Sequence, residues 1–173
     1  SNYCWFFFLV MLILNRNHFL YHNNKKYRCS LGKNGIKYFK KEGDLCTPQG
    51  LFRLGPVFYR KDRNLKLKTK LTIVPIQKNM YWEDNPYNIN YNKLVFKKVA
   101  SNEKLFRKDN IYDVIILINY NTDPILAGRG SAIFIHIAKK NYQPTKGCIA
   151  LNKKDLLEIL SNISKNEKIL VIF

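Results

Sequence analysis

Short stretches rich in Ile, Val, Phe and Tyr recur along this chain, and each of them ends at a turn signal. Stretches of this length and composition are typical of strands, whereas helices need longer segments with a 3.6-residue period. The segment 114–118 is continuously apolar, so we expect a central strand that is covered on both faces, with 132–137 beside it. The sequence therefore predicts a mainly β fold. The predicted strands are 11–14, 18–21, 26–30, 51–59, 71–76, 93–99, 111–120, 131–138 and 168–173.

The segments that connect these strands indicate how the chain is organised. Asn-rich segments at 15–17 and 22–24 separate the first three predicted strands, which is typical of antiparallel hairpins. One helix is predicted to begin at Asn152, a good N-cap residue, because apolar residues follow it at spacings of three and four. Asp155, at the third helical position, suits a start that resembles a capping box.

The length and the amino-terminal segment set the expected domain boundaries. A chain of 173 residues with no Ser/Pro/Gly-rich linker is long enough for one domain with its own core, which we expect over 11–173. The apolar run 4–14 is shorter than the about 20 residues of a spanning helix, so no stable membrane span is predicted. Residues 1–10 are either a truncated export segment or an extraneous extension before Met11.

Cys148 and His136 form the strongest chemical signal in the sequence. A cysteine attacks as its thiolate, and a nearby imidazole that takes the proton raises its reactivity. His136 ends an apolar run that can hold its ring, whereas His18 and His22 lie far upstream in an Asn-rich stretch. Cys148 follows Gly147 in a turn where a thiol can be exposed and backbone N–H groups can converge, and the helix dipole would lower the thiol pKa if the helix pointed at it. The alternative is that Cys148 is an inert, packed residue.

The residues around this pair resemble the L,D-transpeptidase catalytic domain family (YkuD-like), and in particular a subgroup of short bacterial proteins. The family signature is a histidine followed by a Ser/Thr-x-Gly-Cys turn. The resemblance extends over roughly 11–173. The matching segments are 43–52, 82–84, 91–92, 128–136 and 144–151, which include His136 and the turn 145–148.

The resemblance implies a β-sandwich or distorted barrel with one helix after the Cys turn, and a cysteine-dependent acyl transfer on peptidoglycan stem peptides. Cys148 would attack the carbonyl that precedes a D-residue, and His136 would act as base and then as acid. Backbone N–H groups of Gly147 and Cys148 would hold the oxyanion. The resemblance implies no cofactor, and it places the activity in the periplasm or cell envelope.

One departure from the family pattern concerns recognition of the substrate. Many members carry an arginine that binds a carboxylate where this chain has Ala150, so hydrolysis by an L,D-carboxypeptidase or peptidase is the alternative to cross-linking. Arg129 could supply a guanidinium instead, or it is a solvated turn residue. Trp82 and Asp84 are expected to line the cleft, or to belong to a loop that the tryptophan anchors. Thr145 is a further candidate for substrate contact.

The net charge and the cysteine spacing limit which other classes of function are expected. Lys and Arg total 30 against 12 acids, a formal net charge of +18, but these bases are spread along the chain without interleaved stacking aromatics. We therefore expect no nucleic acid as partner, and a non-catalytic domain that binds an anionic cell wall or another polyanion is the competing class. No cysteine pair has the C-x-x-C spacing, so no metal site is predicted. The sequence leaves open whether Cys29 and Cys46 pair.

Overall fold

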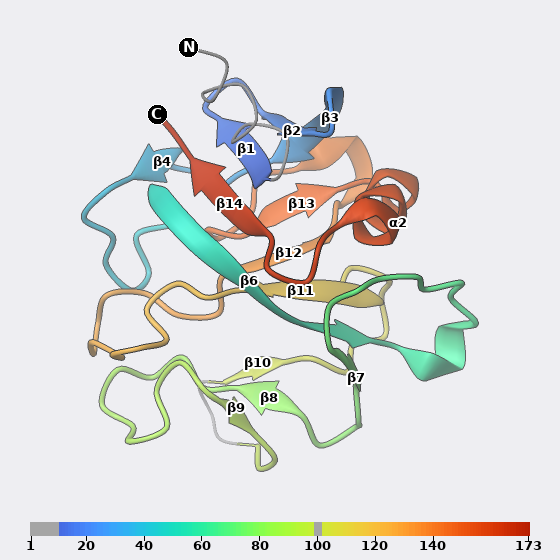
Figure 1. Ribbon diagram of the computed structural model, residues 1–173. Coiled ribbons are helices and arrows are strands. Elements are labelled where there is room, and N and C mark those ends of the chain that lie inside the picture. Colours follow the sequence, from blue (N-terminus) through green and yellow to red (C-terminus); the bar gives the residue numbers. More distant parts are fainter. Residues whose placement is uncertain (1–10, 99–101) are drawn as a thin grey trace.

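The computed structural model in Figure 1 describes residues 11–98 and 102–173. The predicted export segment or extension, 1–10, lies outside the described residues. Strands dominate, and α2 (Lys153–Asn162) is the one α-helix of the described ranges, which confirms the mainly β fold with a helix after the Cys turn. The other elements are β1 (Met11–Asn15), β2 (Phe19–His22), β3 (Lys25–Ser30), β4 (Ile36–Lys37), β5 (Thr47–Pro48), β6 (Gly50–Tyr59), η1 (Lys61–Arg63), β7 (Ile73–Pro75), β8 (Tyr81–Trp82), β9 (Leu94–Val95), β10 (Glu103–Lys104), β11 (Val114–Ile118), β12 (Phe134–Ile137), η2 (Lys140–Tyr142), β13 (Ile149–Leu151) and β14 (Lys168–Val171).

The largest sheet has nine strands and closes on itself into a distorted barrel. Its order is β11-β12-β13-β3-β2-β1-β14-β6-β7, and an additional pairing joins β6 to β11. Because β6 is 10 residues long, it pairs with two strands of the ring: 50–53 pair with β14, and 54–59 pair with β11. The ring is therefore closed through β6, and β7 lies outside it as an added strand. The first three strands form the predicted antiparallel hairpins.

Side chains alternate between the barrel interior and its outer face along each strand. On β11, Val114, Ile116 and Ile118 belong to the interior core, while Ile115 and Leu117 belong to a second core on the outer face. All five residues are buried. The predicted central strand is thus covered on both faces.

A three-stranded sheet, in the order β10-β8-β9, covers the outer face of β11 and β12 and lies below them in Figure 1. Trp82 of β8 makes the main contact between the two layers. Its ring lies edge-on to Phe58 of β6 and Phe134 of β12, with ring centroids 6.2 and 5.3 Å apart. Aromatic pairs of this geometry add to the energy of burial. The layer over β12 forms one wall of the cleft described below.

The helix begins where the sequence predicts it. The side-chain oxygen of Asn152 accepts a hydrogen bond from the Asp155 backbone N–H at 2.9 Å, so Asn152 is the N-cap. Leu156, Ile159 and Leu160 are fully buried in the interior core. No helix within 11–98 or 102–173 is long and apolar enough to cross a membrane.

The main departure from the predicted elements is β13, which follows Cys148 directly. The sequence predicted a passage from the Cys turn to the helix without a strand. The segment Ile149–Leu151 has only three residues, too few to show an alternating pattern. It is a strand because β12 and β3 supply hydrogen-bonding partners on its two sides.

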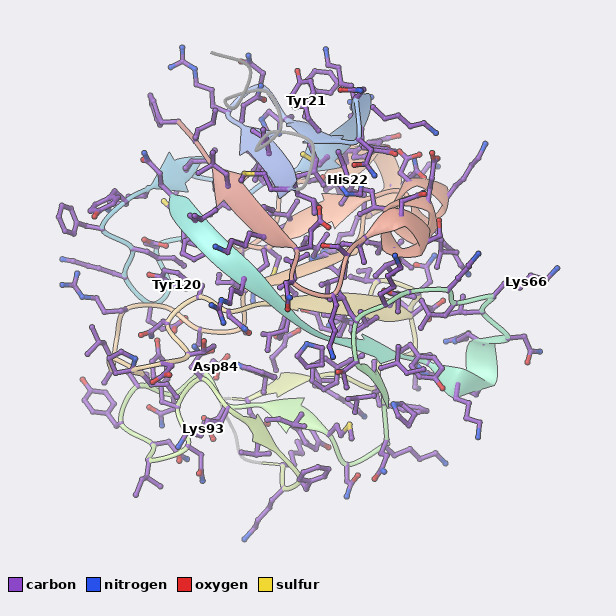
Figure 2. The ribbon with its side chains drawn as sticks, in the orientation of Figure 1. Tyr21, His22, Lys66, Asp84, Lys93 and Tyr120 are labelled. Carbon is purple, nitrogen blue, oxygen red and sulfur yellow. The ribbon has the colours of Figure 1, made fainter. Side chains whose placement is uncertain are left out.

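A buried pair of His22 and Glu167 ties the β2–β3 hairpin to the segment before β14. The His22 Nε2 and Glu167 Oε1 atoms are 3.1 Å apart, and each residue is 3% exposed. The other oxygen of Glu167 accepts from the Ser164 backbone N–H at 2.7 Å. Figure 2 shows His22 in the upper half of the molecule and Asp84 in the lower half, so this pair is remote from the cleft.

Replacement of Glu167 by alanine is expected to lower the free energy of unfolding by about 2 kcal/mol, because buried donors of His22 and Ser164 lose their acceptor. Burial alone would raise the pKa of Glu167, but the hydrogen bonds from His22 and Ser164 outweigh it and hold that pKa below its usual range. The folded pKa is depressed, so this contribution is present above the unfolded value of about 4.3 and is lost as the pH falls through the folded pKa. Urea unfolding of wild type and Glu167→Ala at pH 7 and pH 3 tests this. A difference in unfolding free energy that does not shrink at pH 3 would contradict it.

Candidate active site

The pairing of β12 with β13 brings the two predicted catalytic residues to one face of the barrel. The strands are parallel, with His136 opposite Ala150 and Ile135 opposite Ile149. Because side chains alternate along a strand, His136 and Ala150 both point away from the barrel interior. Cys148 precedes Ala150 by two residues and belongs to the same outer face. Tertiary pairing thus places the thiol and the imidazole on the same outer face, where both line one cleft.

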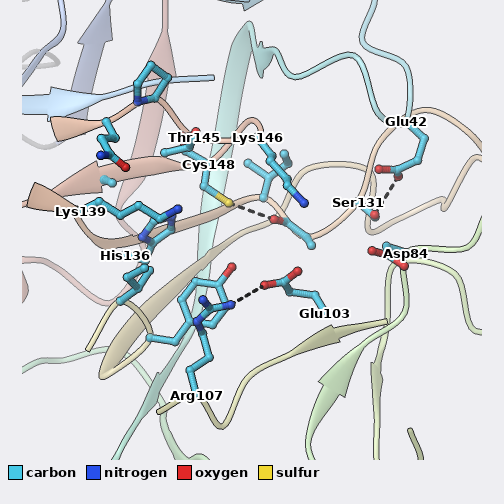
Figure 3. Close-up of a pocket in the computed structure, with 17 residues that line it drawn as sticks. Glu42, Asp84, Glu103, Arg107, Ser131, His136, Lys139, Thr145, Lys146 and Cys148 are labelled. Atoms are coloured by element: carbon cyan, nitrogen blue, oxygen red, sulfur yellow. Dashed lines mark hydrogen bonds and ion pairs between the residues drawn. The ribbon is translucent and has the colours of Figure 1, made fainter. Parts of the chain in front are cut away.

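Both side chains face a cleft of about 330 Å³ between the outer face of the barrel and the small sheet (Figure 3). The cleft carries charges of both signs. In Figure 3, Glu42 and Asp84 lie on one side of Cys148, and His136 and Lys139 lie on the other. The charged lining residues are Glu42, Asp84, Glu103, Arg107, Lys139 and Lys146.

The Cys148 thiol is held by two backbone groups of the segment before β12. Its S–H donates to the Ala132 carbonyl, with sulfur and oxygen 3.2 Å apart, and its sulfur accepts from the Phe134 N–H at 3.4 Å. The residue is 9% exposed. Burial raises the pKa of Cys148 to about 12, and the hydrogen bond from Phe134 offsets only part of this effect. The resting sulfur is therefore a neutral thiol at physiological pH.

His136 is held as a neutral base. Its Nδ1 atom lies 2.9 Å from the Ile137 carbonyl oxygen, so Nδ1 carries the proton and the lone pair is on Nε2. The Tyr112 ring packs edge-on against the imidazole, with centroids 5.3 Å apart. Burial lowers the pKa of His136 to about 4, although the hydrogen bond to Ile137 acts in the opposite direction. A neutral imidazole beside a neutral thiol can take its proton during the reaction.

The Cys turn is braced from within and from a neighbouring segment. The Thr145 hydroxyl donates to the Cys148 carbonyl at 2.6 Å and accepts from the Gly147 N–H at 3.1 Å. Thr145 also exchanges backbone hydrogen bonds with Leu31 and Lys33. Gly147 has φ +139°, a conformation that glycine adopts readily and other residues do not. The turn is therefore a local structure that depends on both Thr145 and Gly147.

The helix does not follow the Cys turn directly. The strand β13 separates Cys148 from the first turn of α2, which begins at Lys153. The sequence made a lower thiol pKa conditional on the helix pointing at Cys148, and the pKa of Cys148 is instead raised by burial. The reason is that the dipole acts only near the end of a helix, whereas burial acts at the sulfur itself.

The remaining predicted site residues divide into two groups. Thr145 and Asp84 line the cleft, and burial, followed by the charges of Glu42 and Glu103, raises the pKa of Asp84 to about 6. Trp82 is only 4% exposed and does not line the cleft, because its ring packs beneath Phe134. This packing favours the alternative given for Trp82, a loop that the tryptophan anchors.

Arg129 also lies outside the lining of the cleft, which corrects its predicted place in the site. It is exposed on the loop that reverses the chain between β11 and β12. Its N–H donates to the Leu126 carbonyl, and its own carbonyl accepts from the Tyr120 hydroxyl at 2.5 Å. These contacts bind its backbone into the turn and leave its side chain on the surface.

Arg107 is the guanidinium that the structure places in the cleft, and the sequence analysis missed it. Two of its nitrogens donate to the carboxylate of Asp109 at 2.9 and 2.7 Å, and a third lies 3.4 Å from Glu103. Its guanidinium carbon is 5.2 Å from the centre of the Tyr112 ring. The two-residue spacing of Arg107 and Asp109 is the only signal in the sequence, and such pairs are common on surfaces.

The described residues contain no group of three or more His, Cys, Asp or Glu side chains that could hold a metal ion. Cys29, Cys46 and Cys148 are free thiols and buried.

Comparison with known proteins agrees with this arrangement. The family model of the L,D-transpeptidase catalytic domain (YkuD) matches residues 9–171. The chain belongs to this family. No curated protein matches the sequence.

Two solved structures resemble the fold. The helical cell shape determining protein Pgp2 from Campylobacter jejuni, in a single-residue mutant form, is 18% identical with a TM-score of 0.49, over 94% of this chain and 46% of that protein. An L,D-transpeptidase from Mycobacterium smegmatis is 14% identical with a TM-score of 0.45, over 95% of this chain and 58% of that protein. The chain spans about half the length of these proteins.

Proposed function

We propose that this chain catalyses acyl transfer on peptidoglycan stem peptides through a thioester at Cys148. The observation that supports this most directly is a cleft lined by His136 of β12 and by Cys148, which directly precedes the neighbouring parallel strand β13. The Ile137 carbonyl holds the His136 ring so that Nε2 can accept a proton. Membership of the L,D-transpeptidase family supports the substrate class.

The proposed reaction has two half-steps. In the first, the Cys148 proton passes to His136 Nε2 while the sulfur attacks the donor carbonyl carbon, and the oxyanion forms near the backbone amides of Gly147 and Cys148. In the free protein the Gly147 amide is shared with the Thr145 hydroxyl. The tetrahedral intermediate expels the amine of the D-residue, which takes the proton from His136. In the second half-step, an acceptor amine or water attacks the thioester and restores the thiol.

The charges along the cleft support a peptide that carries both carboxylates and amines. Arg107, Lys139 and Lys146 can pair with carboxylates, and Asp84 with its raised pKa can meet an amine. Arg107 takes the carboxylate-binding role that the sequence analysis gave to Arg129. This chain would act in the cell envelope, where its substrate lies.

Intact-mass spectrometry after exposure to a carbapenem, whose strained amide acylates activated thiols, tests the proposed nucleophile. We expect an adduct on wild type and on Cys46→Ser, but none on Cys148→Ser. An adduct that persists in Cys148→Ser would contradict the proposal. So would an absence of adduct on folded wild type, and binding to cell-wall polyanion that falls steeply with salt would then favour the non-catalytic class.

Incubation with a tetrapeptide stem, with and without an amine acceptor, tests the second half-step. A cross-linked product is expected if the acceptor amine reaches the thioester. Release of a tripeptide alone, at the same rate with or without the acceptor, would identify the protein as an L,D-carboxypeptidase. Ala150 in place of the family's arginine favours this second outcome.

A further inference from the structure

The position of the Cys148 sulfur depends on one short backbone segment, Ala132 to Phe134. Both hydrogen bonds of the sulfur go to this segment, one to the Ala132 carbonyl and one from the Phe134 amide. The first favours the protonated thiol, and the second favours the thiolate. Whatever holds this segment therefore influences where the sulfur lies and how readily it loses its proton.

Asn92 holds the Ala132 end of the segment. The Ala132 N–H donates to Asn92 Oδ1 at 3.0 Å. Ala132 has φ +52°, a left-handed conformation that is unfavourable for residues with a Cβ atom. Such a conformation persists only where surrounding contacts impose it. The bond to Asn92 is the contact that fixes the peptide whose neighbouring carbonyl faces the thiol.

Asn92 also reaches the Phe134 end through Trp82. The Trp82 Nε1 atom donates to the same Oδ1 at 2.9 Å, and the Trp82 ring packs edge-on against Phe134. The amide nitrogen of Asn92 donates to the carbonyls of Tyr120 and Asn121 at 3.1 and 2.7 Å. With 4% exposure and every polar atom bonded, Asn92 has one possible orientation.

We propose that Asn92 is a positioning residue that sets the orientation and the protonation of the Cys148 thiol through Ala132 and through the Trp82–Phe134 contact. This inference rests on the proposed role of Cys148 as nucleophile. Asn92 touches neither the sulfur nor His136. In the resting protein it keeps the S–H bonded to the Ala132 carbonyl, and on reaction the S–H bond breaks and the proton forms an N–H bond at His136 Nε2.

The loss of Asn92 is expected to change two reactivities in opposite directions. Without its anchor, Ala132 relaxes, water reaches the sulfur, and the pKa of the thiol falls toward its ordinary value of about 8.5. Alkylation of Cys148 by iodoacetamide at pH 7.5 should then become at least about tenfold faster. Acylation by a carbapenem should become at least about tenfold slower, because the sulfur is no longer held toward the reacting geometry.

Asn92→Gly is the test variant, and Asn121→Gly is its matched control. Both asparagines have positive φ, +57° and +53°, so glycine suits both backbones. The Asn121 side chain forms hydrogen bonds with Leu126 and Gly130, and the structure gives it none with Ala132 or Phe134. Both variants lose side-chain hydrogen bonds to loop backbone, and only the first loses the bond to the Ala132 amide.

The measurement is site-resolved mass spectrometry of the Cys148 peptide after iodoacetamide treatment between pH 7 and 10. In wild type and Asn121→Gly the rate should rise about tenfold per pH unit throughout, whereas in Asn92→Gly it should reach a plateau. A plateau in both variants, or in neither, would overturn the proposal. If Asn92→Gly does not fold, Trp82→Phe is the second variant. It removes the hydrogen bond from Trp82 Nε1 to Asn92 Oδ1 and keeps an aromatic ring against Phe134. The same change with a smaller amplitude is then expected, and an unchanged profile would overturn the proposal.

This test is separate from that of the proposed function. If folded wild type forms no carbapenem adduct, Cys148 is not an acyl acceptor, and the proposed function fails. The alkylation profile reads the thiol alone, so it tests the positioning role in either case.

Discussion

His136→Gln is expected to slow acylation of Cys148 by about 10² to 10⁴-fold, the usual contribution of a general base. Glutamine keeps a side chain of similar length and polarity but has no basic nitrogen at the Nε2 position. The rate of carbapenem adduct formation, followed by intact mass, measures this loss. His18→Gln is the matched control, because His18 is exposed on the β1–β2 turn. An equal loss in both variants would contradict the assignment of His136 as base.

The pH dependence of acylation also tests the assignment of His136 as the general base. Because the pKa of His136 is lowered to about 4, the base stays neutral down to that pH, and the acid limb of the profile is expected near 4 rather than at the ordinary value of about 6.5. Between these values the unfolded chain binds a proton at this histidine and the folded chain does not. The free energy of unfolding should therefore decrease as the pH falls from about 6.5 towards 4, by an amount that is smaller in His136→Gln. An acid limb near 6.5 would show that the imidazole is solvated.

Gly147→Ala is expected either to lower the free energy of unfolding by more than about 2 kcal/mol or to displace the Cys turn. If the turn is displaced, acylation should slow by about 100-fold or more. At φ +139° an L-residue is strained, and an alanine Cβ would lie 2.8 Å from the Cys46 carbonyl oxygen. A backbone atom cannot move aside as a flexible side chain can. Urea unfolding and the rate of adduct formation measure the two effects.

Gly35→Ala separates strain from steric clash. Gly35 has φ +79°, and a Cβ atom there meets nothing within 4 Å. This variant should lose about 1 kcal/mol through strain alone, with acylation unchanged. If Gly147→Ala behaves in the same way as Gly35→Ala, the close approach to Cys46 does not constrain the turn.

Local features of the sequence were enough to predict the type of most elements. Hydrophobic runs and Asn-rich turns identified the strands of the barrel, and Asn152 identified the start of the helix, because residue period, capping and turn chemistry act over a few neighbours. The same local features identified Cys148 and His136 as a candidate pair. The short strand β13 was missed since three residues carry no period.

The composition of the cleft could not be predicted in this way. Arg107 and Lys139 line the cleft from loops that follow β10 and β12, and no sequence spacing links them to Cys148. Arg129 and Trp82 looked suitable in sequence, yet one lies outside the cleft lining and the other is buried beneath Phe134.

The sequence by itself determined a mainly β chain with a capped helix, and a cysteine in a glycine turn downstream of a histidine. Only the tertiary structure decided that β12 and β13 pair in parallel, with His136 and Cys148 on the same outer face. It also decided that burial keeps the thiol and the imidazole neutral. The physical reason is that strand partners, register and desolvation depend on contacts between distant segments, whereas turns, caps and residue periods are set by neighbours in the chain.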